Sequence, residues 1–162
     1  MKKLTLLAVL MIGVLAFAQK KADQQPKSDP WAGTWKMDVA KSKLHGPAPK
    51  EEIVTSEGTG PNGDIVKFNI TAVRPDGTTV HESFDGKSDG QPYPFIANGQ
   101  EVAKNSYRRV SPHQYSGQGT GADGSTSSET ITLSKDGKTI TIQSHSKGQQ
   151  GEYDETVVYN KQ

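Results

Sequence analysis

Apolar and polar residues alternate along most of the chain beyond residue 50. Val66, Phe68 and Ile70 fall on one face of a segment whose intervening residues are polar, and segments 130–133 and 139–142 alternate Thr with Ile or Leu in the same way. Successive side chains of a β-strand point to opposite faces, so a period of two predicts half-buried strands.

Tight-turn dipeptides separate these alternating segments. Asn or Asp followed by Gly suits the two positive φ angles of a type I′ hairpin turn. Seven such pairs occur: Asn62-Gly63, Asp76-Gly77, Asp85-Gly86, Asp89-Gly90, Asn98-Gly99, Asp123-Gly124 and Asp136-Gly137. Together the two signals predict ten strands, near 33–38, 51–57, 65–73, 78–84, 91–96, 101–110, 113–119, 126–134, 139–146 and 152–160.

Short connections between these strands predict an up-and-down antiparallel order. Ten strands in an open sheet would leave two long edges unpaired, and closure removes both edges. The predicted fold class is therefore all-β, an antiparallel up-and-down β-barrel of about ten strands. At most one short helical turn is expected after the first strand, within residues 39–44. An open sheet and a two-sheet sandwich are the alternatives.

The first 18 residues have the pattern of a secretory signal peptide. A basic pair, Lys2-Lys3, precedes an apolar run, and Ala16-Phe17-Ala18 forms a small-x-small cleavage site. Residues 19–30 are polar and predicted to be a disordered leader, and residues 31–162 form the predicted domain. We therefore expect a protein of the periplasm or one that is secreted, with no integral membrane segment after cleavage. An uncleaved N-terminal anchor is the alternative.

Composition narrows the possible partners. The chain has 19 basic and 18 acidic residues, and loss of Lys2 and Lys3 would leave a net charge of −1. Such a balance has no electrostatic footprint for nucleic acid. Cysteine is absent, which excludes disulfides, thiol nucleophiles and Cys-based zinc sites.

Catalytic and metal motifs are not recognisable in the sequence. His81, His113 and His145 recur every 32 residues, but none has a second ligand two or four residues away on its own element. Adjacent carboxylates such as Glu51 and Glu52 point to opposite faces of a strand and cannot act as an acid–base pair. The glycine-rich segment 117–121 lacks the following helix that a phosphate site needs. We expect no catalytic residue, no metal and no cofactor.

The two ends of the domain resemble a known family. Gly33-Thr34-Trp35 is similar to the Gly-x-Trp opening of lipocalins and to the first strand of cellular fatty-acid-binding proteins, and residues 156–161 resemble the last strand of the latter. The chain also looks like small exported bacterial proteins with a lipocalin-like domain. This lipocalin-like (calycin) resemblance implies a barrel that holds an apolar molecule.

Two departures limit what the resemblance implies. The fatty-acid-binding family has an Arg-x-Tyr in its last strand that holds a ligand carboxylate, whereas this chain keeps Tyr159 but has Val157 at the arginine position. Residues 39–49 are also too few for that family's helical lid. We therefore expect no fatty-acid clamp.

The resemblance and the alternation phase together give a predicted ligand-binding wall. Its members are the residues expected to face inward: Trp35, Met37, Phe68, Ile70, Tyr107, Arg109, Tyr115 and Tyr159. Arg109 could orient a polar ligand group beside a tyrosine, or could instead form an exposed ion pair. Trp31, next to the leader, should matter less than Trp35 if it is only a lid or surface residue.

The leading function hypothesis is non-catalytic, extracytoplasmic binding of a small lipophilic ligand, lipid-like or otherwise amphipathic. The alternative is a protein-interaction module, an inhibitor or envelope scaffold, whose barrel is filled by side chains. An enzyme ranks last because no catalytic constellation was found. Cavity volume distinguishes the first two hypotheses, since a hollow barrel favours ligand binding.

Overall fold

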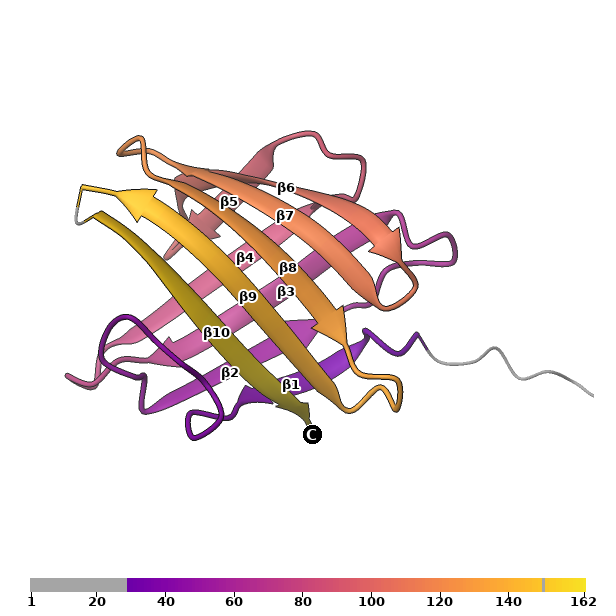
Figure 1. The fold of residues 1–162 in the computed structure, drawn as a ribbon, viewed down its shortest axis with the longest axis horizontal. Helices are drawn as coiled ribbons and strands as arrows, with labels where there is room; N and C mark the ends of the chain where they lie inside the picture. Colours follow the sequence, from indigo (N-terminus) through magenta and orange to yellow (C-terminus); the bar gives the residue numbers. More distant parts are fainter. Residues whose placement is uncertain (1–28, 150) are drawn as a thin grey trace, which may run out of the picture.

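A computed structural model describes residues 29–149 and 151–162 and shows one closed antiparallel barrel (Figure 1). Each strand pairs with its neighbours in sequence, and β1 pairs with β10 to close the sheet. This confirms the predicted all-β up-and-down barrel. The strands are β1 Gly33–Met37, β2 Glu51–Ser56, β3 Ile65–Val73, β4 Thr79–Lys87, β5 Tyr93–Ala97, β6 Gln100–Ser111, β7 Gln114–Gly121, β8 Thr126–Leu133, β9 Thr139–Gly148 and β10 Gly151–Lys161.

The barrel has two facing walls. Figure 1 shows β6–β10 as one wall lying across β1–β5, with the strand directions of the two walls crossing. The predicted signal peptide and most of the predicted leader lie outside the described residues. Asp29 and Pro30, the last two residues of that leader, are described, and Asp29 makes hydrogen bonds to the barrel.

The segment between β1 and β2 completes the closure. β1 is short, and beyond it the chain continues beside β10, where Lys43 and Thr156 exchange both backbone hydrogen bonds. The N–H groups of Lys41 and Ser42 both donate to the carbonyl oxygen of Asp38. The expected helical turn is thus a single hydrogen-bonded turn, and the described residues contain no helix.

Most of the Asn/Asp-Gly pairs do not form the predicted type I′ turn. Only Asn98-Gly99 has two positive φ angles, 49° and 81°, since Asn98 is the one non-glycine residue with positive φ in the described chain. At Gly77, Gly124 and Gly137 the glycine alone has positive φ. The preceding aspartates instead accept a hydrogen bond from the backbone N–H two residues on, an Asx turn that needs no positive φ at Asp.

Asp85-Gly86 is a clearer correction, because it lies inside β4 and makes no turn. A Cβ on Gly86 would lie 2.8 Å from both the Phe84 and the Tyr93 rings. This glycine therefore serves close ring packing inside the barrel.

Candidate functional site

The barrel encloses a cavity of about 280 Å³ between its two walls. The predicted alternation in β3 is confirmed, because Val66, Phe68 and Ile70 all line this cavity. It is bounded by six of the eight residues predicted from sequence: Trp35, Phe68, Ile70, Tyr107, Tyr115 and Tyr159.

Met37 and Arg109 do not line the cavity. Met37 is partly buried and packs against the hydrophobic core. Arg109 shares the inward phase of Tyr107 but lies exposed at the barrel rim, where its guanidinium donates to the carbonyl oxygens of Asn62 at 3.0 Å and Ser111 at 3.4 Å. Arg109 is therefore held by backbone carbonyls, neither facing the cavity nor paired with a carboxylate.

Two tryptophans fill one end of the barrel, which we call the closed end. Trp35 is 0% exposed and Trp31 is 7% exposed. The indole N–H of Trp35 donates to the Trp31 carbonyl at 3.2 Å, and that of Trp31 donates to the Pro112 carbonyl at 3.1 Å. The Trp31 ring also packs edge-on against Tyr115, with 5.1 Å between centroids. Trp31 is thus part of the core and not a surface lid.

Hydrogen bonds from the chain preceding β1 hold the two tryptophans, which we call the plug together with Tyr115, in place. The Asp29 carboxylate accepts hydrogen bonds from the backbone N–H groups of Trp31 and Thr59 and from the Thr59 hydroxyl. The phenol of Tyr115 donates to the Gly63 carbonyl at 3.1 Å. Because Thr59 and Gly63 belong to the β2–β3 connection, these bonds tie that connection to the closed end.

A second aromatic group lies on the opposite side of the cavity. Phe84 packs edge-on against Tyr107 at 4.9 Å and stacks on Phe68 at 5.6 Å, measured between ring centroids. Phe95 joins Phe68 at 6.5 Å. Of these rings, Phe68, Phe95 and Tyr107 line the cavity, and Phe84 packs behind them. Aromatic faces carry negative partial charge, so this apolar wall can also attract a cation.

One carboxylate, Glu129, faces this aromatic wall. Strand pairing places Tyr107, Gly117 and Glu129 in one row across β6, β7 and β8. A Cβ on Gly117 would lie 2.6 Å from the Glu129 Oε1 and 2.8 Å from the Tyr107 ring. Gly117 therefore allows both side chains to fold over its backbone and into the interior.

Burial sets the protonation of these two groups. It raises the pKa of the Glu129 carboxyl, an effect that hydrogen bonding to Tyr107 opposes. The pKa of Tyr107 lies well above its ordinary value of 10.0, first because of burial and second because of the Glu129 charge. The phenol is consequently neutral, and Glu129 is the group of this pair that ionises first, with a pKa above its ordinary value of 4.5.

Two further glutamates belong to the interior. Glu52 on β2 accepts a hydrogen bond from the Tyr159 phenol, and burial raises the pKa of Glu52. Glu82 on β4 pairs in register with the cavity residue Ile70. Burial and then the Glu52 charge raise the pKa of Glu82.

The cavity adjoins a wider polar mouth at the other end of the barrel. This mouth has a volume of about 700 Å³ and lies at the β7–β8 turn and the end of β9. It shares Phe95, Asn105 and Ser127 with the cavity. The mouth and the cavity therefore meet at these three residues.

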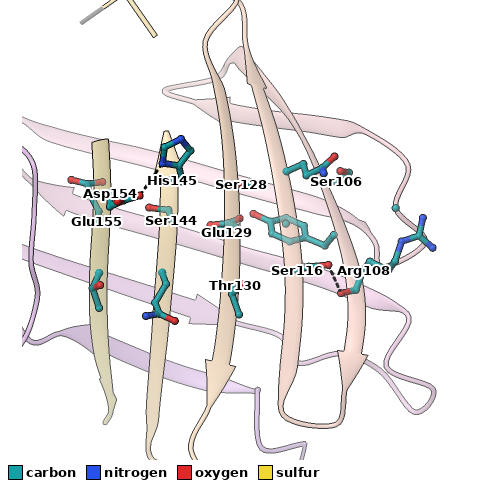
Figure 2. Close-up of a pocket in the computed structure, with 16 residues that line it drawn as sticks. Ser106, Arg108, Ser116, Ser128, Glu129, Thr130, Ser144, His145, Asp154 and Glu155 are labelled. Carbon is teal, nitrogen blue, oxygen red and sulfur yellow. Dashed lines mark hydrogen bonds and ion pairs between the residues drawn. The ribbon is translucent and has the colours of Figure 1, made fainter. Parts of the chain in front are cut away.

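The outer face of β6–β10 carries a shallow depression of about 760 Å³ (Figure 2), whose lining shares Tyr107 and Glu129 with the internal cavity. Figure 2 shows Ser106, Ser116, Ser128 and Thr130 along it, and His145 Nδ1 lies 2.8 Å from an Asp154 carboxylate oxygen. The groups lining it are mainly polar, and fewer than half of them are exposed. It lacks the enclosure of the internal cavity.

Sequence reasoning missed the three interior glutamates. Glu129 lies two and four residues before the inward-facing Ile131 and Leu133, so alternation places it on the same face. Glu52 has the same relation to Val54. The alternation phase carried this signal, but only adjacent carboxylate pairs were considered from the sequence.

Comparisons with known proteins give no further assignment. No protein-family model matches the chain, and no curated protein matches its sequence. Within residues 29–149 and 151–162, no group of three or more His, Cys, Asp or Glu side chains is arranged to hold a metal ion. No helix of that part is long and apolar enough to cross a membrane.

Proposed function

We propose that the protein binds a small apolar or amphipathic molecule, without catalysis, inside a lipocalin-like barrel. The observation that carries this proposal is the internal cavity of about 280 Å³, which adjoins an open mouth. At about 30 Å³ per water molecule, it holds roughly nine waters or one small ligand. Ligand pockets in proteins commonly measure about 300–1,000 Å³; this cavity lies just below the lower end of that range and therefore suits only a small ligand.

A filled-barrel interaction module is the second candidate. The plug of Trp31, Trp35 and Tyr115 favours it, because these side chains occupy one end of the interior. The plug leaves the opposite end open, and Phe68, Phe95 and Tyr107 line the space that remains. Cavity occupancy is therefore the property that separates the two candidates.

Displacement of the neutral dye Nile red tests binding directly. We expect the protein to bind the dye and octanol to displace it. Ile131→Phe should weaken dye binding because Ile131 lines the cavity. The matched control is Thr132→Phe, which adds a ring at the next, exposed position and should leave binding unchanged. No dye binding by the folded protein would reject this function and favour the interaction module.

We further propose that the protein acts outside the cytoplasm, as the pattern of residues 1–18 indicates. Mass spectrometry of protein recovered from the periplasm or the medium should give an N-terminus at Gln19. Recovery of the intact chain, beginning with Met1, from the membrane fraction would contradict export.

A further inference from the structure

We propose that the barrel selects ligands that carry a protonated amine on an apolar body, with Glu129 as the group that receives the amine. This inference rests on the proposed binding function and specifies the ligand class for the same cavity. It follows from which charges the interior contains, where Glu129 lies, and what surrounds it.

Negative charge predominates in the interior, although the charge of Arg74 acts on Glu82 and opposes the rise of its pKa. Glu129 lines the cavity, and Glu52 and Glu82 occupy inward positions on the opposite wall. Lys67 is the one basic residue among the described residues lining the cavity, and its ammonium lies 3.3 Å from Glu57 and 3.5 Å from Asp85. Asp85 is 72% exposed, so this ammonium is directed to the outer surface. A buried charge is costly without a partner, and a ligand cation would supply one.

The surroundings of Glu129 suit an ammonium group. The Tyr107 ring lies beside Glu129 above Gly117, and Phe68 and Phe84 lie against that ring. An ammonium between a carboxylate and aromatic faces gains both a charge-assisted hydrogen bond and cation–π attraction. The apolar body would extend towards Ile131, Ile142 and the Trp35 plug.

The same arrangement disfavours a carboxylate ligand. Arg109, the cation that sequence placed on the wall, is held at the rim by the Asn62 and Ser111 carbonyls. A fatty acid in the cavity would bring a second negative charge towards Glu129 with no cation to offset it. Octylamine, octanol and octanoate share one chain length and separate these cases.

The experiment is displacement of Nile red by these three compounds at about pH 8, where an alkylamine is still protonated. We expect octylamine to bind at least about tenfold more tightly than octanol, a difference of about 1.4 kcal/mol, and octanoate to bind more weakly than octanol. Equal binding of octylamine and octanol, or preference for octanoate, would overturn this inference while leaving the proposed function intact. Failure of all three to displace the dye would overturn both.

Substitution of Glu129 identifies the group responsible. Glu129→Gln keeps the shape and removes the charge, so it should lower octylamine affinity about tenfold and leave octanol affinity unchanged. Glu51→Gln is the control, because it removes the same net charge from an exposed position that pairs with Lys36 outside the barrel. Equal losses in the two variants would assign the preference to net charge and contradict a role for Glu129. Should Glu129→Gln not fold, the order of the three compounds on the unmodified protein still decides the ligand class.

Discussion

At the scale of single residues, the two tryptophans of the closed end contribute to the stability of the folded protein by different amounts. Trp35 has no exposed surface and Trp31 has very little. Replacement of a buried Trp by Ala typically costs about 3–5 kcal/mol. We therefore expect both Trp35→Ala and Trp31→Ala to lower the denaturant midpoint substantially, with Trp35→Ala having the larger effect. Val110→Ala is the control, because Val110 is 58% exposed. A smaller shift for Trp35→Ala than for Trp31→Ala would contradict this order.

Glu82 makes a pH-dependent contribution to stability. Its folded-state pKa is raised above the ordinary value of 4.5, by burial and then by the Glu52 charge. The folded state therefore holds this proton more tightly than the unfolded chain does, and stability falls as pH rises from 4.5 through the raised pKa. Glu82→Gln should stabilise the protein at neutral pH and flatten its stability profile across this window.

Thermal unfolding at a series of pH values between about 4 and 8 measures that effect. The control is Glu51→Gln, since Glu51 is an exposed member of an ion pair with Lys36 and such pairs contribute little. A stability profile of Glu82→Gln with the same slope as the unmodified protein would show that Glu82 does not carry the pH dependence.

At the scale of elements, β7 is defined by its glycines. Gly117 and Gly119 face the interior, and a Cβ on either would meet side chains of both neighbouring strands, including Glu129 and Asn105, at under 3 Å. The strand thus contributes backbone where its neighbours contribute side chains. Close packing against the neighbouring strands therefore explains the glycines of this Gly-x-Gly-x-Gly segment, and no phosphate site is needed to explain them.

Gly117→Ala tests this purpose. The added methyl group would displace Tyr107 and Glu129, and such overpacking typically costs about 1–3 kcal/mol. Denaturant titration should show this loss, and Nile red binding should weaken because Tyr107 lines the cavity. Gly46→Ala is the matched control, since a Cβ there has no neighbour within 4 Å and its φ is not positive. Equal stability of the two variants would contradict the role of Gly117.

The local sequence pattern was sufficient to predict the strands but not the conformations of the turns. Alternation in β3, β8 and β9 reflects one buried and one exposed face, a property that each strand carries in its own sequence. Asp85-Gly86 has the sequence of a turn, yet its glycine serves the packing of Phe84 against Tyr93, a residue of the next strand. Tertiary packing decides the conformation of this dipeptide, and that packing cannot be predicted from the two residues alone.

The candidate site was also predicted only in part: its aromatic residues followed from the sequence, whereas its charged residues did not. Phase identified the aromatic positions, because large apolar residues on the inward face of a barrel must meet. It placed Arg109 on that face correctly, but it could not show that the long side chain reaches the carbonyls of Asn62 and Ser111 at the rim. Glu129 was missed because only adjacent carboxylate pairs were considered, and Glu129 has no acidic neighbour in the sequence. A buried carboxylate is unusual, so its inward phase was the signal that could have found it.

At the scale of the whole molecule, the barrel has a tryptophan plug at one end and a mouth at the other, with the aromatic wall and Glu129 between them. The β6–β10 wall supplies Tyr107 and Glu129, and the β1–β5 wall supplies Phe68 and Phe84. The cavity is therefore formed only when the barrel closes. This dependence ties ligand affinity to the closed fold, and ligand binding should in turn raise the unfolding temperature by mass action.

The ionisation of Glu129 should make amine binding depend on pH in a way that alcohol binding does not. The pKa of Glu129 is raised by burial, and Tyr107 and Tyr159, whose own pKa values lie well above 10.0, stay neutral in the same range. Glu155 follows Glu129 and Ser144 in the same row across β8, β9 and β10, so its carboxylate adds to the negative potential.

Octylamine affinity should therefore fall as pH decreases from about 8 through the raised pKa of Glu129, because a neutral carboxyl loses most of its attraction for an ammonium group. Octanol affinity should stay constant over the same range, which also shows that the protein remains folded. Glu129→Gln should remove the pH dependence of octylamine binding, whereas Glu51→Gln should retain it. An octylamine affinity that is independent of pH, or that changes equally in Glu129→Gln and the unmodified protein, would show that the carboxylate of Glu129 does not receive the amine.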